Sequence, residues 1–149
     1  VKEENLANRV DIFIEKSAFQ PEESKEFLLK AKDLGFEITV HADQFTPGSS
    51  RIAVEVGAKS ADHLEATIDE DIAFIAHSDT VATALPGASL GLGEKFTPAR
   101  TILDAGGILG IQVLHPWEIS LPNVRFWRLT KNYLLQKCLQ GLLFGRLSL

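Results

Sequence analysis

Short apolar runs alternate with amphipathic stretches along the first 111 residues of this chain. The runs predict strands, and the stretches between them predict helices. We expect strands at residues 10–14, 36–41, 60–63 and 80–85, with a last one near residue 108, and helices at residues 21–34, 50–57, 68–76 and 98–105. This alternation is typical of βαβ units around a parallel sheet. Because a closed eight-fold barrel needs about 250 residues, the sequence predicts an α/β fold that forms about half of a TIM-like (β/α) barrel.

One helix and one loop are predicted in most detail. Pro21 with acidic residues after it is typical of the first turn of a helix, and Gly35 is typical of a helix end. The apolar residues between them recur at helical spacing: Phe27, Leu28, Ala31 and Leu34. Residues 87–93 are rich in glycine but lack the Gly-Lys-Ser/Thr ending of a P-loop and the GxGxxG spacing. We expect a flexible loop over the mouth of the barrel there.

The composition excludes several classes of protein. The net charge of −5 lacks the basic excess that a nucleic-acid-binding surface needs. No apolar run approaches the ~20 residues of a membrane span. The single cysteine, Cys138, provides no disulfide framework, which favours a reducing, cytoplasmic location. The chain starts at Val1 rather than at a methionine, so we expect that its beginning is missing.

The character of the chain changes near residue 112. Residues 1–111 hold 10 Lys/Arg against 19 Asp/Glu, whereas the rest of the chain holds 5 against 1. All 15 alanines lie in the first part, and both tryptophans and the only tyrosine lie in the second. So sharp a break predicts a domain boundary or a change of origin. We therefore divide the chain into a partial barrel, residues 1–111, and an aberrant tail, residues 112–149.

Two of the four histidines follow predicted strands, where the active site of a parallel α/β barrel gathers. They are His41 and His63. Neutral imidazole is a good ligand for zinc or iron, so one histidine could hold a metal while the other handles a proton. Their spacing leaves a simpler interpretation open, in which both are hydrogen-bonded structural residues. His77 follows a predicted helix and is interpreted as a solvated C-terminal cap.

Several motifs resemble those of the imidazolonepropionases, a family of metal-dependent amidohydrolases in histidine degradation. They are VDIF at 10–13, VHADQ at 40–44, SADHLE at 60–65, LPGA at 85–88 and DAG at 104–106. The motifs occur in the family's order and with family-like spacing across nearly all of residues 1–111. HADQ followed by SADH is a far more specific signal than either motif alone.

The resemblance implies a metal-binding (β/α) barrel that hydrolyses 4-imidazolone-5-propanoate to N-formimino-L-glutamate. It implies that His41 is a zinc or iron ligand, that Gln44 contacts the substrate ring, and that His63 is the catalytic histidine that assists proton transfer. It also implies a homodimer for the intact protein. The expected partner is therefore a small-molecule substrate, and neither nucleic acid nor a membrane is expected.

The family pattern is incomplete in this chain. The sequence lacks the His-x-His pair that supplies two metal ligands in the family, and it lacks the TD-x-NPG segment with the aspartate ligand. One expected ligand remains, which is too few for a tight site, so we expect the isolated chain to be inactive. Two alternatives stay open: another amidohydrolase such as a base deaminase, which Gln44 and the spacing from His41 to His63 disfavour, and a non-catalytic relic fragment.

The genetic code offers an explanation for the tail. When the last base of each codon is read with the first two of the next, synonymous codons allow residues 112–118 to encode GSAPMG. Later segments can encode LLT, LATYEK, EVLAG and RAA, which resemble the end of the family pattern. The single codon of Trp117 supplies the methionine, and shifted alanine codons explain why the tail has no alanine. We therefore expect residues 112–149 to be an out-of-frame translation.

Overall fold

The computed structural model describes residue 4, residues 6–112 and residues 127–129. Five parallel strands are β1 (Arg9–Phe13), β2 (Glu37–Ala42), β3 (Ser60–His63), β4 (Val81–Ala84) and β5 (Leu109–Ile111). The helices among the described residues are α1 (Pro21–Asp33), α2 (Ser49–Glu55), α3 (Asp69–Ala76), α4 (Pro86–Leu92) and α5 (Ala99–Asp104). The predicted α/β class is confirmed, and the ends of the predicted strands and helices lie within about two residues of the observed ones.

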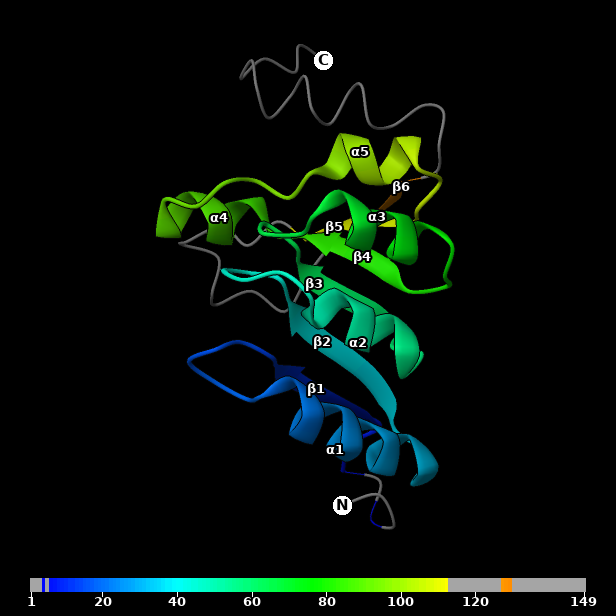
Figure 1. The fold of residues 1–149 in the computed structure, drawn as a ribbon. Helices are drawn as coiled ribbons and strands as arrows, with labels where there is room; N and C mark the ends of the chain where they lie inside the picture. The colour runs from blue at the N-terminus through cyan, green and yellow to red at the C-terminus, as the bar shows by residue number, and fades with distance from the viewer. Residues whose placement is uncertain (1–3, 5, 113–126, 130–149) are drawn as a thin grey trace.

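The five parallel strands lie in chain order, from β1 to β5. Right-handed crossovers between neighbouring parallel strands all leave the sheet on the same side. The helices α1, α2, α3 and α5 accordingly form one layer over one face of the sheet, and successive helices of this layer contact each other (Figure 1). A doubly wound sheet would reverse its strand order and carry helices on both faces. The observed order is compatible with part of a (β/α) barrel.

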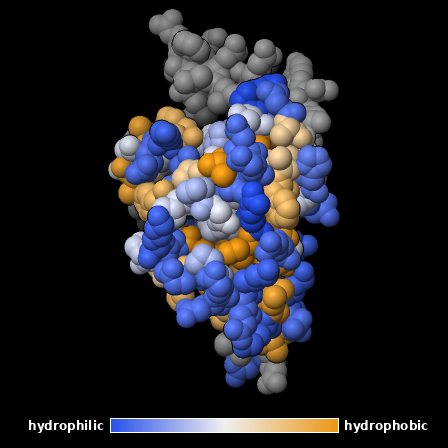
Figure 2. Space-filling view, viewed as in Figure 1, coloured by the Kyte–Doolittle hydropathy of each residue, from blue (hydrophilic) through white to orange (hydrophobic). Residues whose placement is uncertain are grey.

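The hydrophobic core lies between the sheet and this helical layer. The strand register aligns one apolar residue from each parallel strand in a row: Ile12, Val40, Ala61, Ala82 and Leu109. All five are buried. The outer surface of the layer is mainly hydrophilic with scattered apolar residues (Figure 2), as expected for helices that bury a single face.

The helix predicted from the spacing of its apolar residues is confirmed as α1, but these residues are not all buried. Leu28 and Ala31 are buried, whereas Phe27 is 50% exposed and Leu34 is 68% exposed. Ser24 occupies the third buried position, and its hydroxyl donates to the carbonyl of Gln20 at 2.6 Å. Each residue of an α-helix is rotated by about 100° around the helix axis from the one before it. Phe27 and Leu34 therefore lie to one side of the face that the three buried residues form.

The glycine-rich segment forms the helix α4, so its prediction as a flexible loop was wrong. Pro86 occupies the first turn, where its missing N–H is not needed, and Gly93 ends the helix in a left-handed conformation with φ of 72°. Ser89 is buried, and its hydroxyl donates to the Glu65 carboxylate at 2.6 Å. This tertiary contact compensates for the poor helix propensity of the glycines. The helix lies at the end of the sheet toward which the strands point (Figure 1).

The aberrant tail lies outside the described residues except for Gln112 and a short strand, β6 (Trp127–Leu129). This strand, which was not predicted from the sequence, pairs antiparallel with β5. The division of the chain at residue 112 stays a prediction. Across the described part of the chain, no helix combines the length and the apolar character needed to cross a membrane.

Candidate functional site

His41 and His63 lie side by side at the C-terminal edge of the sheet, as predicted from their places in the sequence. β2 and β3 are neighbours and pair in parallel, so both strands end at the same edge. The centroids of the two imidazole rings are 5.2 Å apart, and the ring planes are tilted by 45°. Two histidines at this distance can act on one small ligand.

His63 approaches His41 through an unusual backbone conformation. In the strand register His63 pairs with Ala42, a core residue, so a continuous pleat would direct its side chain toward the helices. The φ angles are instead 82° at His63 and 68° at Leu64, in the left-handed region. Such residues cost about 1–3 kcal/mol each and cluster at functional sites, where the surrounding structure compensates for the strain.

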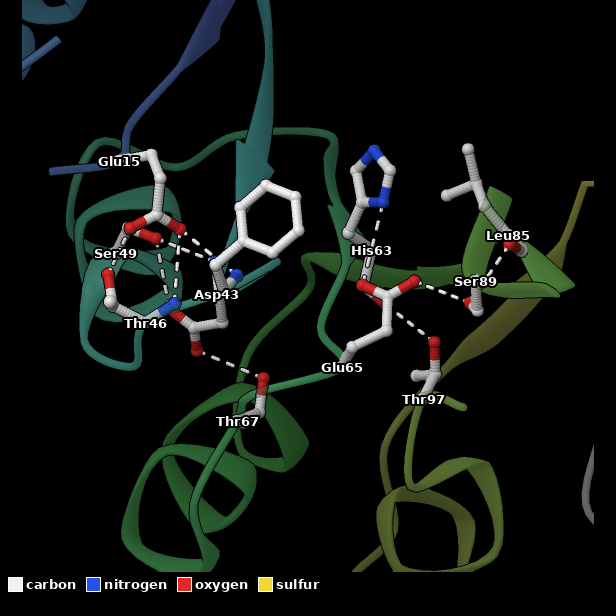
Figure 3. Close-up of polar contacts among 11 residues, drawn as sticks. Glu15, Asp43, Thr46, Ser49, His63, Glu65, Thr67, Leu85, Ser89 and Thr97 are labelled. Carbon is white, nitrogen blue, oxygen red and sulfur yellow. Dashed lines mark hydrogen bonds and ion pairs between the residues drawn. The ribbon is translucent and has the colours of Figure 1, made fainter. Parts of the chain in front are cut away.

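Two hydrogen bonds fix this turn. The N–H of Leu64 donates to the carbonyl of Ala42 at 3.0 Å, which ties the turn to the end of β2. The hydroxyl of Thr97 donates to the carbonyl of His63 at 2.5 Å (Figure 3). The left-handed conformation is therefore stabilised from the neighbouring strand and from the segment that precedes α5.

Asp11 orients the imidazole of His41. Its Oδ1 lies 2.9 Å from His41 Nδ1. This hydrogen bond raises the pKa of His41 against the opposing effect of burial, and the negative charges of Asp11 and Asp62 raise it further. Asp62 lies beside His41 in the strand register, and burial raises the pKa of its carboxyl. Because Asp11 occupies Nδ1, the Nε2 atom of His41 is the nitrogen left for a ligand.

Glu65 has the corresponding place beside His63. Its Oε2 lies 3.5 Å from His63 Nδ1, and both side chains are buried (Figure 3). The other oxygen, Oε1, accepts the hydroxyl hydrogen bond of Ser89. Burial acts to raise the pKa of Glu65, but the neighbouring His63 and the hydrogen bond from Ser89 outweigh it and lower the pKa. Each histidine of the pair therefore faces a carboxylate through Nδ1.

A third carboxylate, Asp43, joins the two loops that follow the histidines. Its side chain is fully buried, and its φ angle of 48° is again left-handed. The carboxylate accepts hydrogen bonds from three hydroxyls and one N–H, which belong to Ser49, Ser50 and Thr67. The carbonyl of Asp43 accepts the N–H of Ala66 at 2.7 Å. Asp43 thus connects the loop after β2 to the loop after β3.

The remaining predicted residues have different outcomes. Gln44 is buried in the loop between β2 and α2, and its contact with a substrate stays a prediction. His77 follows α3, and its Nδ1 lies 2.6 Å from the carbonyl oxygen of Ala73, which agrees with a capping role. The roles of Asp11 and Ser89 were not predicted from the sequence. For Glu65, the sequence provides one signal: an acidic residue stands two positions after His63.

His41 fits one ligand position of a zinc or iron site. A carboxylate at the second ring nitrogen is the usual outer partner of a metal-bound histidine, and Asp11 supplies it here. Among the residues that the structure describes, no group of three or more His, Cys, Asp or Glu could hold a metal ion. The described residues therefore fit such an ion in part, with His41 as a single ligand.

Comparisons with known proteins agree with the motifs. No family model matches the chain. The chain is 51% identical over 128 residues to the imidazolonepropionases of Bacillus thuringiensis (strain Al Hakam), Bacillus cereus (strain B4264) and Bacillus anthracis (strain CDC 684 / NRRL 3495). Each match covers 84% of this chain, which spans only 30% of the length of each relative. This chain is therefore a homologue of the imidazolonepropionases over 84% of its own length.

Proposed function

We propose that residues 1–111 are the C-terminal βα units of an imidazolonepropionase barrel. We propose further that the intact protein hydrolyses 4-imidazolone-5-propanoate to N-formimino-L-glutamate. The observation that carries this proposal is the adjacent pair His41 and His63, each facing a carboxylate at the C-terminal edge of a singly wound parallel sheet. The names of the relatives support the substrate.

The residues of this chain divide the chemistry between them. Hydrolysis forms a C–O bond at the ring carbonyl carbon, breaks the ring C–N bond, and transfers a proton from water to the leaving nitrogen. His63 is the group that moves this proton, and Gln44 contacts the substrate ring. His41 offers Nε2 as one ligand of a zinc or iron ion. When bound, such an ion lowers the pKa of a coordinated water toward neutrality.

The isolated chain is inactive in this proposal, because its described residues provide one ligand where a catalytic metal site needs about three. The test is a chimera in which residues 1–111 replace the homologous segment of the Bacillus cereus relative. We expect the chimera to open the imidazolone ring and the 149-residue chain to show no turnover. A folded chimera that binds metal but has no activity contradicts the proposal.

Three properties of the intact protein belong to the same proposal. It is a homodimer, it resides in the cytoplasm, and its ion is zinc or iron. Light scattering of the chimera measures the first property, and elemental analysis of the purified chimera distinguishes the two metals. An active chimera that is monomeric would contradict the proposed homodimer but not the proposed activity.

We also propose that residues 112–149 are an out-of-frame translation. The support is the reversal of charge at residue 112 and the loss of alanine beyond it. The matched 84% of the chain is more than residues 1–111 alone, so the test must also find where the shifted frame begins. Sequencing the DNA is that test. Codons that cannot encode GSAPMG in the shifted frame contradict the proposal.

A further inference from the structure

Two buried residues that the proposed chemistry leaves without a role lie behind His63. Glu65 directs Oε2 toward His63 Nδ1 at 3.5 Å and Oε1 toward the hydroxyl of Ser89 at 2.6 Å (Figure 3). Within the described part of the chain, neither His63 Nδ1 nor Glu65 Oε2 has a hydrogen-bond partner, and their contact of 3.5 Å is longer than a normal hydrogen bond. These two buried polar atoms therefore face each other without another partner.

The position of Glu65 is fixed from two sides. Glu65 follows the left-handed turn at His63 and Leu64, so its backbone is tied to that of the histidine. Ser89 comes from α4, and its hydroxyl also lies 3.1 Å from the carbonyl oxygen of Leu85, which keeps it in place on the first turn. A carboxylate with one oxygen engaged by a hydroxyl has little freedom to turn away from the imidazole.

The chemistry of the contact depends on where the imidazole proton lies. A neutral imidazole carries one N–H and one lone pair, whereas an ionised carboxylate can only accept. A proton on Nδ1 makes the contact with Oε2 attractive. A proton on Nε2 would place the Nδ1 lone pair against a negative oxygen in a buried environment, where such repulsion is poorly screened.

We propose that Glu65, held by Ser89, is a positioning residue that keeps the proton of neutral His63 on Nδ1. The basic nitrogen of His63 is then Nε2, and this is the atom that exchanges a proton with the substrate. The catalytic use of this arrangement rests on the proposed function, whereas the position of the proton is a property of the chain itself. The two are tested separately.

The test is nitrogen NMR of the 149-residue chain labelled with 15N in histidine. Spectra are recorded at increasing pH until the His63 signals no longer change, so that the neutral ring is observed. The signals of His63 are assigned by their loss in His63→Asn, because asparagine tolerates a left-handed backbone. We expect His63 to carry its proton on Nδ1 and to show an unprotonated Nε2.

Two variants and one control test whether Glu65 and Ser89 determine the tautomer of His63. In Glu65→Gln the amide can donate as well as accept, so we expect a mixture of both tautomers or a shift to Nε2–H. In Ser89→Ala we expect a smaller shift in the same direction. The matched control is Glu15→Gln, which removes another buried, hydroxyl-bonded carboxylate, and it should leave the His63 signals unchanged.

Each possible result of these measurements either supports or overturns the inference. A wild-type His63 with its proton on Nε2, or with protons on both nitrogens, overturns the inference. An unchanged tautomer in folded Glu65→Gln also overturns it. Should Glu65→Gln fail to fold, Ser89→Ala decides, and an unchanged tautomer there overturns the role of Ser89. A confirmed Nδ1–H in a chain whose chimera is inactive rejects the proposed function and leaves this inference standing.

Discussion

At the scale of single residues, carboxylates organise the C-terminal edge of the sheet. Asp11, which faces His41, is exposed. Asp43 and Glu65 are buried and accept from hydroxyl groups, and the buried Glu15 does the same in the loop after β1. A buried charge is tolerated only when such partners satisfy it. Removing the charge from one of these residues should therefore disturb the loop that it joins.

Asp43→Asn should lower the free energy of unfolding by about 1–3 kcal/mol, because the amide nitrogen cannot accept the hydrogen bonds of the serines and threonine. Asparagine tolerates the left-handed φ of this position, so the backbone is not a second cause. Chemical denaturation measures the change. Asp33→Asn at the exposed end of α1 is the control and should change stability by less than about 0.5 kcal/mol.

Glu15 gives a pH dependence of stability. Burial acts to raise its pKa, but hydrogen bonds from the Thr46 hydroxyl and from the N–H groups of Lys16, Phe45 and Thr46 lower it overall. A lowered pKa means that the unfolded chain binds the proton first. The stability from Glu15 is therefore full above its ordinary pKa of about 4.3 and is lost as the pH falls through the lowered value.

Glu15→Gln should reduce stability at pH 7 by about 1–3 kcal/mol and flatten the acid limb of the stability curve. Denaturation at a series of pH values measures both effects. Glu26 is the comparison, because its pKa is also lowered, by a hydrogen bond from Lys30, but the pair is exposed. Glu26→Gln should have a much smaller effect, and an equal effect would show that the buried hydrogen bonds of Glu15 do not stabilise the fold.

At this scale, some site residues could be predicted from the sequence and their long-range contacts could not. His41 and His63 could be predicted, since each lies at the end of a segment that was predicted as a strand. The contacts of Asp11 and Ser89 could not be predicted, because Asp11 lies 30 residues from His41 and Ser89 lies 24 from Glu65. These contacts depend on the parallel register and on the left-handed turn at His63, which the pattern of residues 60–63 does not specify.

At the scale of elements, α4 is the segment whose identity depends most on its surroundings. Its glycines disfavour a helix, and the buried hydrogen bond of Ser89 and the left-handed end at Gly93 favour one. The other helices were predictable because apolar residues recur at helical spacing or because acidic residues mark their first turn. Tertiary contacts such as that of Ser89 do not appear in a local pattern.

Two alanine substitutions test this account of α4. Gly91→Ala lies within the helix with open space around it and should stabilise the fold by about 0.5–1 kcal/mol. Gly93→Ala also has open space but requires a left-handed φ, so it should destabilise by about 1–2 kcal/mol. Thermal unfolding measures both. Equal effects of the two substitutions would indicate that the segment is not a helix ending at Gly93.

At the scale of the whole molecule, the five parallel strands in chain order with helices on one face are compatible with part of a (β/α) barrel. The α/β class could be predicted from the alternation of strands and helices. A closed barrel could not be inferred from this chain, because it spans 30% of the length of its relatives.

We propose that His41 and His63 form one catalytic site. The most direct test of this proposal is kcat/KM for imidazolone hydrolysis by the chimera and three single variants: His41→Ala, His63→Asn and His77→Asn. We predict that His63→Asn lowers kcat/KM by about 10²–10⁴-fold, the range for loss of an acid–base group. We predict that His41→Ala loses both bound metal and activity, and that His77→Asn, at the cap of α3, leaves activity within about twofold. A folded His63→Asn chimera with undiminished kcat/KM would contradict the account.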